Sequence, residues 1–95
     1  MIVSTRLTIT TTAQRVVPAS SNPQKVKLLN AGGEVVRIGG DADVSPTLAF
    51  GINRLPDNPN VARNLFEFTL NPGEEIWAIV NANTSDLNVW YQRTI

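Results

Sequence analysis

The chain has 95 residues and a mass of 10.3 kDa, which leaves room for one compact domain. It contains no cysteine and no histidine, which excludes disulfides, Cys/His zinc sites, thiol nucleophiles and triads with an imidazole base. Eight Lys and Arg residues balance eight Asp and Glu residues, so the net charge favours neither a nucleic acid nor an anionic membrane as partner. No apolar run is long enough for a signal peptide or a membrane span, and we expect a soluble protein made in a cytoplasm.

The chain has fewer charged residues than ordinary soluble domains and more uncharged polar ones. Charged residues make up 17% of the chain, and Asn, Thr and Ser together supply 24 of the 95 residues, which favours turns and solvated strand faces over long helices. A β domain of this size hides only about 60–65% of its surface on folding. Without disulfides or a metal site, such a domain is a good candidate for stabilisation by oligomerisation or by docking on a larger surface.

Near the N-terminus, alternating apolar and polar residues predict a first strand over residues 5–12. Residues 1–4 precede it as an N-terminal arm that is free to reach a neighbour. The prolines and serines of residues 18–23 break regular structure, which predicts a loop that also carries residues 15–17.

The next expected element is a β-hairpin. Residues 25–28 and 36–38 both alternate between apolar and polar side chains, and they flank Gly32 and Gly33. Glycine supplies the positive φ angle that short hairpin loops require, so we expect these two strands to pair with each other.

The rest of the chain shows strand patterns separated by turns. A loop-rich, proline-broken stretch reaches Asn64 and has room for a short strand around residues 48–50; further strands are expected at 66–70, 75–80 and 87–94. No window shows helical periodicity. The sequence therefore predicts an all-β fold: a single antiparallel β-sandwich domain over residues 1–95, jelly-roll-like, with six to eight short strands.

The two tryptophans lie on predicted strands with different patterns. Trp77 is expected in the core, but its strand is apolar on both faces, so the second face needs a loop, a second sheet or another subunit to cover it, and Ile76 becomes a candidate interface residue. Trp90 should point outward together with Gln92. This mixture suits packing under a loop of the same chain, a protein interface or a sugar-binding platform.

The charged residues indicate a functional site less clearly than the tryptophans do. Arg54 and Arg63 bracket a proline-broken segment, residues 55–62, that suits a contact loop, although exposed solvated charge is the plainer interpretation. Asp41 and Asp43 are better explained by turn chemistry than by a calcium loop. No carboxylate pair shows a sign of converging, so we expect no catalytic residues, no metal, no cofactor and no enzyme activity.

From Lys27 onward, the order of short motifs resembles a group of small accessory virion proteins of tailed bacteriophages. The matching pieces are K-L-L-N, V-V-R-I-G-G, G-I-N-R-L-P, L-N-P-G-E-E, W-A-I-V and a closing L-N-V, and the stretch over which they are spread covers about two-thirds of the chain. The resemblance implies a compact β-sandwich that decorates or cements the capsid, or sits in head or tail fibres, usually as a trimer. It supplies no catalytic residue.

The resulting expectation is a capsid decoration (cement) protein, assembled in the host cytoplasm and placed on the capsid exterior, that bridges neighbouring major capsid proteins as a homotrimer. The candidate interface residues are Arg54, Arg63, Ile76, Trp90 and Gln92. The alternative is a carbohydrate- or receptor-binding module of a phage tail or head fibre that uses Trp90 and Tyr91 as a stacking platform.

Overall fold

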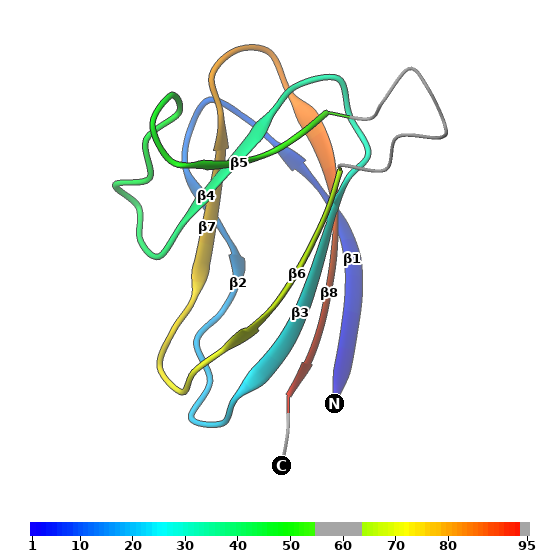
Figure 1. Ribbon diagram of the computed structural model, residues 1–95, viewed down its shortest axis with the longest axis vertical. Helices are drawn as coiled ribbons and strands as arrows, with labels where there is room; N and C mark the ends of the chain where they lie inside the picture. The colour runs from blue at the N-terminus through cyan, green and yellow to red at the C-terminus, as the bar shows by residue number, and fades with distance from the viewer. Residues whose placement is uncertain (55–63, 94–95) are drawn as a thin grey trace.

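The computed structural model describes residues 1–54 and 64–93, and within them the chain folds into two packed antiparallel sheets (Figure 1). This confirms the predicted all-β sandwich. The strands are β1 (Ile2–Ile9), β2 (Gln14–Val17), β3 (Gln24–Asn30), β4 (Val36–Gly39), β5 (Phe50–Ile52), β6 (Leu65–Leu70), β7 (Ile76–Val80) and β8 (Ser85–Arg93). Sheet A has the order β1-β8-β3-β6, and sheet B has the order β2-β7-β4-β5. No described segment forms a helix long and apolar enough to cross a membrane.

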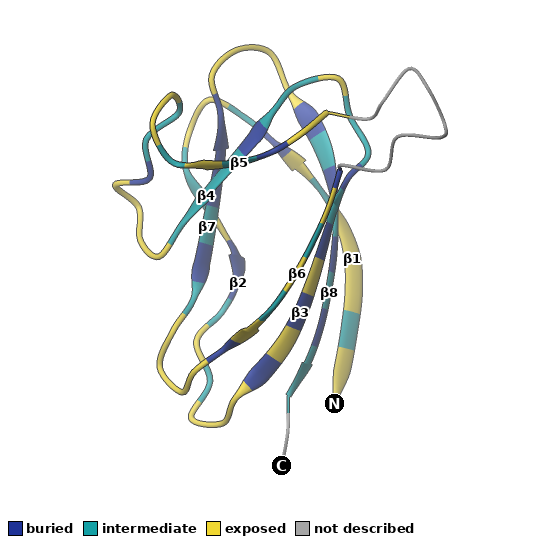
Figure 2. Ribbon diagram, viewed as in Figure 1, coloured by how far each residue is buried: buried dark blue, intermediate teal, exposed yellow. Residues whose placement is uncertain are grey.

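The core lies between the two sheets and follows from alternation along the strands. Strand β8 is the clearest case, because Leu87, Val89 and Tyr91 are buried while the residues between them are half-buried on the outer face, as predicted. Strand β3 alternates in the same way. Figure 2 shows the consequence, since the central strands are the most buried and the edge strand β1 is mostly exposed.

Strand β1 begins earlier than the sequence predicts. Residues 2–4 belong to this strand and pair with β8, so the expected N-terminal arm is instead the start of an edge strand. The cause is the length of β8, whose nine residues offer backbone partners along the whole of β1. Where β1 begins and β8 ends, the backbone N–H of Arg93 donates to the carbonyl oxygen of Met1 at 3.0 Å.

The predicted loop at residues 15–17 is wrong, because these residues lie in β2. Val16 and Val17 are both buried, although neighbours in a regular strand face opposite sides. The pairing of β2 with β7 shifts register between Arg15 and Val17, which is a β-bulge. A bulge adds one residue to the strand and so allows both valines to face the core.

The predicted hairpin is also wrong, since β3 lies in sheet A and β4 lies in sheet B. The reason is the buried side chain of Asn30 at the end of β3. Its Nδ2 donates to the carbonyl oxygens of Glu34 (2.7 Å) and Ile52 (3.1 Å), and its Oδ1 accepts from the hydroxyl of Ser85 (2.7 Å). These bonds tie the end of sheet A to the segments that enter sheet B, so the chain crosses between the sheets.

The glycines in this crossing do not have the role predicted for them. Among the described residues, only Gly73 and Asn83 have positive φ, so neither Gly32 nor Gly33 supplies a hairpin turn. Gly32 is needed for close approach, because a Cβ there would overlap the Oγ of Ser85. Gly33 faces open space.

Candidate functional site

The described residues form an apolar groove where the two sheets part, between the edge of sheet A and the edge of sheet B. Its volume is about 570 Å³. Strand β6 contributes Phe66, Phe68 and Leu70 from one sheet; the other wall includes Phe50 of β5, and Ile76 of β7 lies deeper in. We call this feature the phenylalanine groove.

Three phenylalanine rings form a continuous row in the groove. The ring centroids of Phe50 and Phe66 are 4.9 Å apart, and those of Phe66 and Phe68 are 4.7 Å apart, both in tilted arrangements. These distances are within the favourable range for aromatic pairs. Phe66 and Phe68 lie two residues apart on β6, so both face the inside of the sandwich.

The groove stays open because the opposite sheet ends in a short strand. Strand β5 has only three residues, whereas β6 has six, so β5 cannot cover the whole inner face of β6. Phe50 is 60% exposed as a result, and nearby in the chain Leu48 is 89% exposed. An exposed aromatic side chain that lines an apolar groove is typical of a binding surface.

Sequence reasoning missed this site. The spacing of Phe66 and Phe68 places both rings on one face of a strand, and that signal was available. No local feature around Phe50 indicates that its ring comes from the other sheet to complete the row.

Ile76, which the sequence predicts as a candidate interface residue, is not exposed on the surface of the described chain. It is 3% exposed and belongs to the core, where its side chain also lines the deep part of the phenylalanine groove. A partner that contacts Ile76 therefore has to enter the groove.

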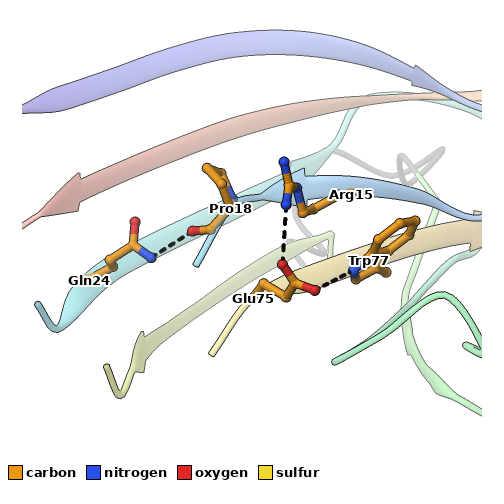
Figure 3. A network of polar contacts seen from close by, with 5 residues as sticks. All are labelled: Arg15, Pro18, Gln24, Glu75 and Trp77. Atoms are coloured by element: carbon orange, nitrogen blue, oxygen red, sulfur yellow. Dashed lines mark hydrogen bonds and ion pairs between the residues drawn. The ribbon is translucent and has the colours of Figure 1, made fainter. Parts of the chain in front are cut away.

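Trp77 takes the position opposite to the prediction, on the outer face of sheet B, where it is half-buried. Figure 3 shows its surroundings. The indole N–H donates to Glu75 Oε1 at 3.0 Å, and Glu75 Oε2 lies 3.5 Å from a terminal nitrogen of Arg15. The inward positions of β7 are filled by Ile76, Ala78 and Val80, so alternation sends Trp77 outward.

A loop covers part of the outer face of sheet B beside β7, and a loop was one of the three predicted options for the cover of the second face of β7. Ile79 is buried outside the main core cluster. Val44, from the segment between β4 and β5, is also buried and packs over Gly39 of β4. The guanidinium of Arg37 donates to the carbonyl oxygen of Ala49 at 2.9 Å and holds the end of this loop against the sheet.

Trp90 and Gln92 lie on the outer face of sheet A, both half-buried. The ammonium of Lys27 stands 5.2 Å from the centre of the Trp90 ring, a cation–π arrangement that occupies one side of the indole. Tyr91 is 8% exposed and faces the core. The predicted stacking platform therefore lacks its second ring.

The predicted interface residues do not gather at one place. Ile76 faces the groove, Trp90 and Gln92 face outward from sheet A, and Arg54 is exposed just after β5. Arg63 and the predicted contact loop at 55–62 lie outside the described residues.

The acidic pair at residues 41 and 43 forms a turn. The backbone N–H of Asp43 donates to the carboxylate of Asp41 at 2.9 Å, which is an Asx-turn. In the ranges that the structure describes, no group of three or more acidic side chains is arranged to hold a metal ion.

Comparisons of this chain with protein-family models, with curated proteins and with solved structures found no match.

Proposed function

We propose that this chain is a phage capsid decoration protein that binds the exterior of the assembled head as a homotrimer and bridges neighbouring major capsid proteins without catalysing a reaction. The single observation that carries the proposal is the phenylalanine groove with its largely exposed ring of Phe50.

In the isolated domain, part of the aromatic row stays in contact with water, most of all the ring of Phe50. A partner that covers this row removes its apolar area from solvent, which is favourable. Aromatic side chains in a recess are also the side chains that contribute most to protein interfaces. The groove therefore favours a function in which the chain is bound to another protein.

The order of sequence motifs supports the choice of partner. Those motifs resemble accessory virion proteins of tailed phages, and a repeating shell offers each copy several equivalent contacts, so modest affinity at each contact gives strong retention. Binding to the folded shell also stabilises both components by mass action.

The proposal is tested with purified heads of the phage that encodes the chain, stripped of this protein. The wild-type chain is expected to co-sediment with the heads and to raise their melting temperature. Replacing Phe50 by Ser is expected to weaken binding about tenfold or more, since it removes about 1.4 kcal/mol or more of contact energy. Phe50 is largely exposed, so the variant should fold normally.

The matched control is Trp90→Ala, which removes an aromatic side chain from the outer face of sheet A and leaves the groove intact. It is expected to bind heads like the wild type. The proposal fails if the wild-type chain neither co-sediments with the heads nor raises their melting temperature. Binding to a glycan array that Trp90→Ala abolishes would point instead to the carbohydrate-binding alternative.

A further inference from the structure

The four edge strands of the sandwich differ in how well they are protected against pairing with another chain. In sheet B, β2 has four residues and a bulge, and β5 has only three residues. In sheet A, β1 has eight residues in unbroken register with β8, and β6 has six residues. Neither β1 nor β6 contains proline or lysine, which are common devices for blocking edge pairing.

The backbone groups that β1 presents at its open edge follow from the ladder. Because the N–H of Arg93 donates to the carbonyl of Met1, this pair is a hydrogen-bonded one, and such pairs alternate along an antiparallel ladder. The hydrogen-bonded residues of β1 are therefore the odd-numbered ones. The N–H and C=O groups of Ser4, Arg6 and Thr8 point away from β8, to the open edge.

Strand β6, at the other edge of sheet A, also presents alternate backbone groups away from its neighbour. The N–H of Asn30 donates to the carbonyl of Asn64, so the even-numbered residues of β6 bond to β3. The backbone groups of Leu65, Glu67 and Thr69 consequently point away from β3, to an edge with which no strand of the described residues pairs.

The two edges are complementary. Strands β1 and β6 run in opposite directions within sheet A, so a second copy placed beside the first can pair them antiparallel. In the register that sets Arg6 opposite Glu67, Ser4 meets Thr69 and Thr8 meets Leu65. Each of these pairs can exchange two backbone hydrogen bonds.

Side chains on both faces agree with this register. On the outer face, Arg6 and Glu67 are exposed and of opposite charge, and the Nε of Arg6 donates to Asn88 Oδ1 at 2.7 Å, which holds the guanidinium on that face. On the inner face, half-buried Leu7 would lie opposite Phe66. The neighbouring copy would thereby extend the apolar wall of the phenylalanine groove.

We propose that copies of this chain assemble head to tail, with the β1 edge of one copy paired antiparallel to the β6 edge of the next. This inference rests on the proposed function, in which the chain acts as a homotrimer, and it names the contact between the subunits. The contact joins two different surfaces, so it generates a ring where the rotation closes.

The test uses two proline variants, Ser4→Pro and Thr69→Pro, and measures mass by light scattering after size exclusion. Both positions are exposed, and both N–H groups point to the open edge, so proline removes no bond within the chain. Each variant alone is expected to stay at the mass of one chain, 10.3 kDa. An equimolar mixture is expected to form a dimer, because one variant keeps an intact β6 edge and the other keeps an intact β1 edge.

A single-chain mass for the wild type would overturn the inference, and so would either variant assembling by itself, which would indicate a contact between identical edges. A mixture that forms no dimer would also overturn it, provided that circular dichroism shows both variants folded.

A charge exchange tests the register and does not depend on the proline variants folding. Arg6→Glu and Glu67→Arg are each expected to weaken assembly about fivefold, and the double variant is expected to restore it. The control is Asp43→Lys, an exposed acidic residue of the loop that follows β4. Weakening that the double variant does not reverse would overturn the register. All these measurements use the chain alone, so failure to bind phage heads would contradict the proposed function and leave this inference standing.

Discussion

Asn30 is the residue whose replacement tests the fold most directly. Its side chain is fully buried and makes hydrogen bonds to the connection after β3, to β5 and to the start of β8. Changing Asn30 to Ala leaves the buried carbonyl of Ile52 and the buried hydroxyl of Ser85 without this partner. Each unsatisfied buried group costs about 1–3 kcal/mol, so we expect a loss of about 3 kcal/mol.

That loss is large for a domain of this size, whose total stability is about 5–14 kcal/mol. It can be measured by urea unfolding followed by tryptophan fluorescence, with stability taken from the midpoint and slope. The matched control is Asn88→Ala, the same substitution at a half-buried position on the outer face of sheet A, where we expect a loss of about 0.5 kcal/mol or less.

A double-mutant cycle with Ser85→Ala isolates the bond between the two side chains, and we expect a coupling of about 1 kcal/mol. A loss of less than about 1 kcal/mol for Asn30→Ala, or one no larger than that of Asn88→Ala, would refute the assignment of Asn30 as the anchor of the crossing.

Five further substitutions have outcomes that follow from the structure. Gly32→Ala should cost about 2 kcal/mol in chemical unfolding, because its Cβ would overlap a side chain of β8, whereas Gly33→Ala should be nearly neutral. Leu28→Ala should cost about 2–5 kcal/mol in the same assay, since the side chain is fully buried; Leu48→Ala, at 89% exposure, should leave the melting temperature unchanged. Gly73→Ala should cost about 1 kcal/mol, because its φ of 84° disfavours any side chain, and an unchanged unfolding midpoint would contradict that reasoning.

The positions of the strands were predictable from the sequence where one face of the strand is more exposed to solvent than the other. Alternation places β6 and β8 almost to the residue, because in each strand more buried and less buried positions alternate. The same signal misses β2, since its bulge puts two valines on one face and removes the alternation on which the prediction depends.

Strand pairing was not predictable from neighbouring residues. The glycine pair after β3 is typical of a hairpin, and no local feature distinguishes a turn from a crossing between sheets. The hydrogen bonds of the Asn30 side chain favour the crossing over the turn, and one of its partners, Ser85, lies far away in the sequence. The groove escaped prediction for a similar reason, because its aromatic row joins Phe50 and Phe66 from different sheets.

The order of strands in the two sheets has a consequence for biosynthesis. Strands β7 and β8 come last in the chain, yet each lies at the middle of its sheet, between β2 and β4 and between β1 and β3 respectively. Strand β1 pairs with β8 and β2 pairs with β7, so neither β1 nor β2 has its ladder partner until these last strands have been synthesised. The two sheets therefore cannot form before β7 and β8 are synthesised, and they depend on contacts between distant parts of the sequence, which makes folding slow for a domain of this size.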